Sequence, residues 1–67
     1  MSAPIRNYQV VLRTVEGVIL KFEITFQMYE EAFGKAVEAA VSFAQDDKHE
    51  VKEIVSVKEV ILGVIEC

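Results

Sequence analysis

The sequence has one cysteine, one histidine, one proline and no tryptophan among its 67 residues. A single cysteine, Cys67, excludes an internal disulfide framework, and Cys67 with His49 is too small a set for a structural zinc site. A domain of this size buries only about 60% of the surface that its unfolded chain exposes. We therefore expect its stability to depend on apolar burial and on association with a partner subunit.

Few glycines and prolines, together with a hydrophobic fraction of 52%, indicate a compact globule and argue against disorder. Residues 1–5 are expected to be a short N-terminal lead-in, and residues 6–67 a single domain. Apolar residues are plentiful for so small a body, so some of them are expected on the surface or in an interface.

The chain has few basic residues, with seven Lys and Arg against eleven Asp and Glu, a net charge of −4 and a pI of about 4.8. A field of this sign repels phosphates and acidic lipid surfaces, which argues against nucleic acid or membrane as a partner. Neither a signal-peptide pattern at Met1 to Pro4 nor an apolar run of bilayer length is present. We expect a cytoplasmic protein, in agreement with the single unpaired cysteine.

Two segments show the period-two alternation of strands that bury one face. The first is 18–26, VILKFEITF, in which the even-numbered residues are all apolar. The second is 6–14, where Tyr8, Val10 and Leu12 alternate with Gln9, Val11 and Arg13. Segment 18–26 is expected to be the best-ordered strand of the sheet.

The hairpin between these strands has one register that keeps both faces consistent. A two-residue loop would set Leu12 opposite Lys21 and mix core and solvent faces. A three-residue loop, residues 15–17, pairs Leu12 with Leu20 and places Gly17 where a left-handed residue is needed. We predict the three-residue loop.

From Met28 to about Gln45 or Asp46 the period becomes that of a helix. Glu30 and Glu31 near its start suit the positive end of the helix dipole. Alanines dominate the apolar arc, with Phe33 and Phe43 as the larger anchors. The arc consists of Tyr29, Ala32, Phe33, Ala36, Val37, Ala39, Ala40, Phe43 and Ala44.

The rest of the chain, residues 51–67, is rich in β-branched residues and predicts strand structure. Ile54 breaks the alternation, and the run 60–65 is apolar on both faces. Lys58-Glu59 is either a tight reversal between two strands or a bulge in one long bent strand. We favour two strands.

These elements give an α+β fold of ββαβ(β) order, a sandwich of one helix packed on one face of a single mixed sheet of three or four strands. A ββαββ order is shared with β-grasp modules. The end Ile65-Glu66-Cys67 lacks the diglycine tail of sulfur carriers, which argues against a carrier role.

No motif indicates catalysis or a cofactor, and we expect a protein that is not an enzyme. The densest polar cluster, Asp46, Asp47, His49 and Glu50, lacks ligand-loop spacing and a second histidine, so a solvated turn is favoured over a metal site. His49 also has no nucleophile nearby in sequence, and Cys67 has no basic neighbour that would activate its thiol. An enzyme with a site between subunits around His49 is the least favoured alternative.

One pattern indicates function. In the predicted registers five apolar residues fall on the sheet face opposite the helix, which would form a patch suited to association; they are Val11, Ile19, Ile54, Ile61 and Ile65. We predict a small acidic non-catalytic interaction module that forms a homodimer through the open sheet face or edge and binds or inhibits a larger protein. By size and charge alone, a phage or mobile-element accessory protein that inhibits a host factor is the alternative.

Overall fold

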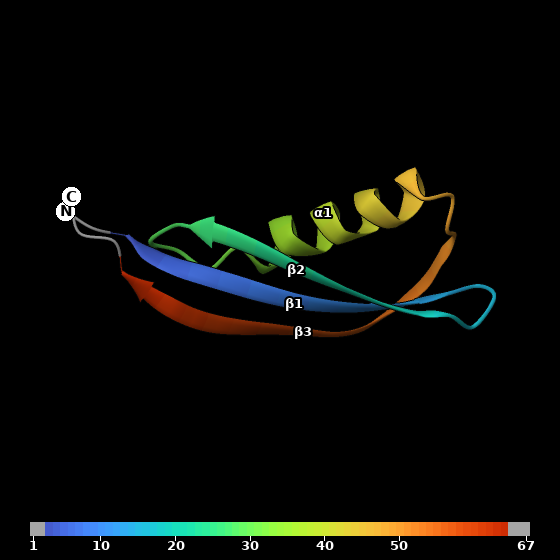
Figure 1. The fold of residues 1–67 in the computed structure, drawn as a ribbon, viewed down its shortest axis with the longest axis horizontal. Coiled ribbons are helices and arrows are strands. Elements are labelled where there is room, and N and C mark those ends of the chain that lie inside the picture. The colour runs from blue at the N-terminus through green and yellow to red at the C-terminus, as the bar shows by residue number, and fades with distance from the viewer. Residues whose placement is uncertain (1–2, 65–67) are drawn as a thin grey trace.

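Over the residues that the structure describes, the protein folds as one three-stranded sheet with one helix on one of its faces (Figure 1). The computed structural model describes residues 3–64. The elements are β1 (Pro4–Thr14), β2 (Ile19–Gln27), α1 (Phe33–Asp46) and β3 (Val51–Val64). The α+β class and the ββαβ order are as predicted.

Strand β1 is central, and the sheet order is β2-β1-β3 with both pairings antiparallel. The prediction of a mixed sheet is therefore wrong, because both strand pairs are antiparallel. The helix carries the chain from β2 across to the far side of β1, so β2 and β3 run in the same direction but do not touch. The order also makes β2 an edge strand.

The β1–β2 hairpin has the predicted register, with Leu12 opposite Leu20 and Val10 opposite Phe22. Its loop is closed by bonds from the Gly17 N–H to the Thr14 carbonyl at 3.0 Å and from the Thr14 N–H to the Val18 carbonyl at 2.9 Å. Gly17 has φ +89°, the left-handed backbone that glycine adopts without steric cost. The three-residue loop is confirmed.

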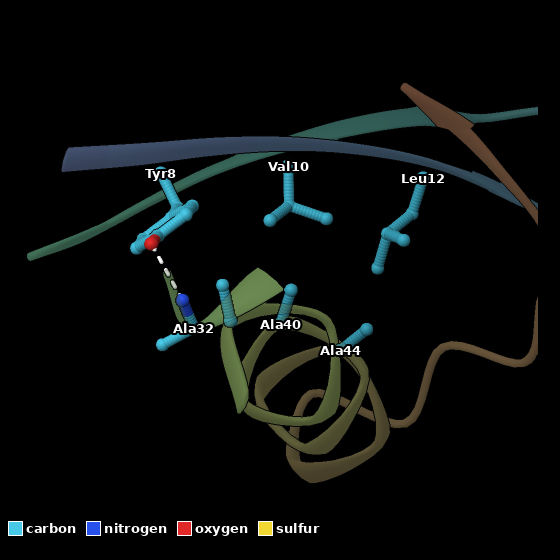
Figure 2. Packing of buried hydrophobic residues seen from close by; sticks show 7 residues of the cluster. Tyr8, Val10, Leu12, Ala32, Ala40 and Ala44 are labelled. Carbon is cyan, nitrogen blue, oxygen red and sulfur yellow. Dashed lines mark hydrogen bonds between the residues drawn. The ribbon is translucent and has the colours of Figure 1, made fainter. Parts of the chain in front are cut away.

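The core is a narrow strip in which β1 packs on a line of alanines along α1 (Figure 2). Tyr8, Val10 and Leu12 are fully buried, and they meet alanines spaced four residues apart, at positions 32, 36, 40 and 44. Because these side chains are a single methyl group, the helix axis can lie close to the sheet. Phe33 and Phe43, predicted as anchors, instead flank the strip and are 38% and 52% exposed.

The helix begins five residues later than its apolar periodicity predicts, at Phe33 and not at Met28. The Arg6 side chain donates to the Met28 carbonyl at 3.0 Å and to the Tyr29 carbonyl at 2.6 Å. Both carbonyls therefore bond to a strand residue and not to a helical turn. The N-cap residue, Ala32, has no side-chain cap, and its N–H donates to the Tyr8 hydroxyl at 2.7 Å.

The C-terminus of α1 closes with a Schellman motif, in which Lys48 holds the left-handed position at φ 62°. The His49 N–H donates to the Ala44 carbonyl and the Lys48 N–H to the Gln45 carbonyl, both at 2.9 Å. Glycine is the usual residue at this position. Lys48 therefore carries a backbone cost that glycine would avoid.

Strand β3 is one 14-residue strand, so the preference for two strands was wrong. Its pairing with β1 shifts register at three places, and in each an extra β3 residue is inserted; the inserted residues are Lys52, Val55 and Leu62. Such bulges bend a strand without ending it. Within residues 3–64 no fourth strand follows.

Candidate interaction surface

The face of the sheet away from the helix is predominantly polar. The β1 and β2 residues on it are those that alternate with the core residues, namely Ile5, Asn7, Gln9, Val11, Arg13, Ile19, Lys21, Glu23, Thr25 and Gln27. A shallow groove of about 470 Å³ runs along the two strands and is lined by Gln9, Val10, Val11, Lys21, Phe22 and Glu23. Three of the lining residues are apolar and three carry charged or amide groups, so the groove is mixed in character and is not a purely apolar docking site.

The structure separates the residues that were predicted to form one apolar patch. Val11 and Ile19 lie on the open face, Val11 half-buried and Ile19 exposed. Ile54 pairs with Leu12 and Ile61 pairs with Arg6, so both belong to the side of the sheet that carries the helix. The prediction of a common face was wrong for these two residues, and Ile65 lies outside the described residues.

The bulge at Val55 explains the displacement of Ile54. An inserted residue reverses the inside–outside alternation on one side of it. Val57 faces the core opposite Val10. Ile54, three residues earlier in the chain, lies on the same side of the sheet because Val55 is inserted between them. A strict alternation counted through Val55 gives the opposite face for Ile54.

Exposed apolar side chains are nevertheless numerous within residues 3–64, and half of the ten lie on the outer strands, one on β2 and four on β3. The ten are Val15, Val18, Ile19, Tyr29, Phe33, Phe43, Ile54, Val55, Ile61 and Leu62. Phe43 stacks on Phe22 of β2, with ring centroids 6.1 Å apart and planes at 25°. An apolar surface therefore continues from the helix onto the β2 edge.

The free edge of β2 is regular over its nine residues, Ile19–Gln27, and pairs with β1 without a register shift. Two hydrogen bonds at the ends of the β1–β2 pair show which residues of β2 bond to β1. The Thr14 N–H donates to the Val18 carbonyl, and the Met28 N–H donates to the Pro4 carbonyl at 3.2 Å. By alternation, the backbone groups of the even-numbered residues of β2 bond to β1. The N–H and C=O groups of the odd-numbered residues, such as Lys21 and Glu23, point to the open edge.

Charge is segregated between the two layers of the fold. The segment 28–50, which includes the helix, holds six acidic and two basic residues, so it carries the net charge of −4. The rest of the sequence holds five acidic and five basic residues and is neutral. Long-range repulsion between two copies therefore arises from the helix layer and not from the sheet.

A polar network that the sequence did not predict joins the start of the helix to the sheet. Glu59 of β3 accepts a bond from Arg6 at 2.5 Å and from the Tyr8 hydroxyl at 3.0 Å. The Arg6 and Glu59 side chains are each 13% exposed. Arg6 and Glu59 are 53 residues apart in sequence, and only the strand register brings them together. The network is saturated by contacts within the chain, which indicates a structural role.

The acidic turn around His49 connects α1 to β3. The Glu50 carbonyl accepts the Val15 N–H at 2.9 Å, which ties this turn to the β1–β2 loop. His49 is half-buried, whereas Asp46, Asp47 and Glu50 are exposed. Across residues 3–64 no three His, Cys, Asp or Glu side chains are grouped closely enough to hold a metal ion.

Helix α1 has 14 residues, and in the described part of the chain no helix has the length and hydrophobicity needed to cross a membrane. No protein-family model, curated protein or solved structure matches the chain.

Proposed function

We propose that this chain is a cytoplasmic, non-catalytic interaction module that self-associates through its sheet and in that form binds or inhibits a larger protein. The observation that carries the proposal is the edge of β2, a regular strand of nine residues whose outer backbone groups have no partner among residues 3–64. An open edge of this kind is a template for pairing with another chain.

The β2 edge has few of the features by which monomeric proteins block strand addition. Proline and bulges are absent from residues 19–27, although both are common at protected edges. The one lysine, Lys21, is accompanied by Glu23 on the same face, so the pair adds no net charge. This strand can therefore accept a neighbour without burying an unpaired charge.

The distribution of charge favours the same part of the molecule. Screening in 0.1 M salt limits the reach of exposed charges to about 10 Å. An approaching copy that meets the neutral sheet edge experiences less repulsion than one that meets the acidic helix layer. Strand β3 remains free when β2 is occupied, which leaves a second exposed edge for a larger partner.

Sedimentation velocity and light scattering over a micromolar concentration series test the self-association. We expect a species of twice the 7.5 kDa chain mass, with a monomer appearing on dilution. A monomer that persists to the highest concentration would contradict the proposal.

A further inference from the structure

We infer that two copies of this chain join β2 to β2 in an antiparallel pair about a two-fold axis at Phe22, forming a continuous six-stranded sheet. The inference rests on the proposed self-association and specifies its geometry. In this pair Phe22 lies opposite Phe22 of the second copy, and Lys21 lies opposite Glu23. Such an interface is isologous and closes at two subunits.

The backbone of β2 is already in the phase that this pairing needs. The N–H and C=O groups of its odd-numbered residues point outward. Lys21 would then exchange two hydrogen bonds with Glu23 of the second copy, and Ile19 two with Thr25. By symmetry the whole interface gains about eight backbone hydrogen bonds.

Charge selects this register from its neighbours. A two-fold axis at any β2 residue keeps the helix side of both copies on one face, and the registers next to the one at Phe22 have the axis at Lys21 or at Glu23. An axis at Lys21 places two lysines directly opposite each other, and an axis at Glu23 places two glutamates opposite each other; like charges in this position are destabilising. Only the axis at Phe22 produces two Lys–Glu pairs.

On the helix side the same register places apolar side chains together. Leu20 faces Ile24 of the second copy, and Phe22 faces its own counterpart across the axis. Strand spacing puts the two β1 strands of the dimer about 14 Å apart. Because each helix packs on its own β1, the two helices are separated by a similar distance, which is wider than the 8–10 Å of helices in direct contact. The Phe43 rings, each 52% exposed and stacked on Phe22, can fill the space between the helices.

Strand β3 is a weaker candidate for the same role. Three register shifts interrupt its pairing with β1, and bulges of this kind disrupt the regular spacing that a neighbouring strand requires. Lys58, which is exposed on β3, therefore provides a control position outside the inferred interface.

Charge reversal tests the register. Lys21→Glu and Glu23→Lys should each raise the dimer dissociation constant roughly tenfold, because each creates two like-charge pairs. The double variant Lys21→Glu/Glu23→Lys should restore the original affinity. Within one chain the cross-strand neighbours of these residues are Val11 and Gln9, both uncharged, so the β1–β2 pairing has no charge pair to lose.

Two controls separate this effect from nonspecific repulsion. The single variants change the net charge in opposite directions, so a general charge effect would strengthen one dimer and weaken the other. Lys58→Glu on β3 makes the same net-charge change as Lys21→Glu, and its neighbour on β1 is the uncharged Gln9; it should leave the dissociation constant unchanged.

Pulsed electron paramagnetic resonance measures the geometry directly. A nitroxide on Gln27→Cys, in a Cys67→Ser background, reports the separation of the two β2 ends. With about 3.4 Å per residue along the strands and about 4.8 Å between them, the axis at Phe22 gives about 34 Å between the labelled backbones, the axis at Lys21 about 41 Å and the axis at Glu23 about 28 Å.

The outcomes distinguish the geometry from the proposed function. A dimer with rescue by the double variant and a distance near 34 Å supports the inference. If the dimer dissociation constant does not change on charge reversal, or if the measured distance differs from about 34 Å, the inferred geometry is wrong and self-association still holds. A monomer at all concentrations overturns both.

Discussion

Replacing Tyr8 with phenylalanine tests the packing between the helix start and the sheet. The Tyr8 side chain is fully buried, and its hydroxyl accepts the Ala32 N–H at 2.7 Å and donates to Glu59 at 3.0 Å. Tyr8→Phe keeps the ring, which contacts Phe33 edge-on at 5.2 Å between centroids. The substitution therefore removes two hydrogen bonds with little change in apolar packing.

The expected cost follows from what remains after the hydroxyl is lost. The N–H of Ala32 lies in a buried helix N-terminus without a side-chain cap, and leaving such a group unpaired costs about 1–3 kcal/mol. The Glu59 carboxylate keeps Arg6 but loses a second donor. We expect the free energy of unfolding to fall by about 2–3 kcal/mol, a large share of the total for a 67-residue domain.

Urea unfolding followed by circular dichroism measures this change, with all variants at one protein concentration because association adds to apparent stability. Tyr29→Phe is the matched control: Tyr29 is 57% exposed, and the same chemical change there should shift stability by less than about 0.5 kcal/mol. If Tyr8→Phe is as stable as Tyr29→Phe, the hydroxyl does not hold the start of the helix and the reasoning fails.

The remaining stability predictions use the same measurement. Lys48→Gly should raise the free energy of unfolding by about 0.5–1 kcal/mol, because glycine adopts the φ of 62° without a side-chain clash; an unchanged or lower value would contradict this. Glu59→Ala should lower it by about 3 kcal/mol, because the largely buried Arg6 loses its counter-charge. Glu53→Ala removes the half-exposed ion pair with Arg13 and should cost less than about 1 kcal/mol; equal losses at positions 59 and 53 would refute the distinction.

Local patterns sufficed to predict the hairpin. Its two strands each have one apolar and one mixed face, so only one register satisfies both, and Gly17 supplies the turn. The apolar arc of the helix also predicts the buried alanines. Both predictions rest on residues that are close in sequence or that share a repeat.

The errors have a common cause, which is contact between residues distant in sequence. The late start of the helix depends on Arg6 binding carbonyls 22 and 23 residues away. The face of Ile54 depends on the bulge at Val55, which alternation cannot reveal because both residues are apolar. The face of Ile61 depends on β3 continuing past Lys58-Glu59 without a turn, so that Ile61 keeps the alternation of Val57. The predicted apolar patch was wrong for this reason, because it included Ile54 and Ile61. The position of the β2 edge does not depend on β3, because the register of β2 is set by the hairpin.

Amide hydrogen exchange provides a last test, in which the monomer supplies its own control. The N–H groups of Leu20 and Phe22 point to β1, while those of Lys21 and Glu23 point to the free edge. Pairing of β2 with a second copy should slow exchange at Lys21 and Glu23 as protein concentration rises. Leu20 and Phe22 should change far less, because they are already bonded within the chain. Association through the open face would leave the edge amides unprotected, so equal exchange at Lys21 and Glu23 in dilute and concentrated dimerising samples would exclude edge pairing.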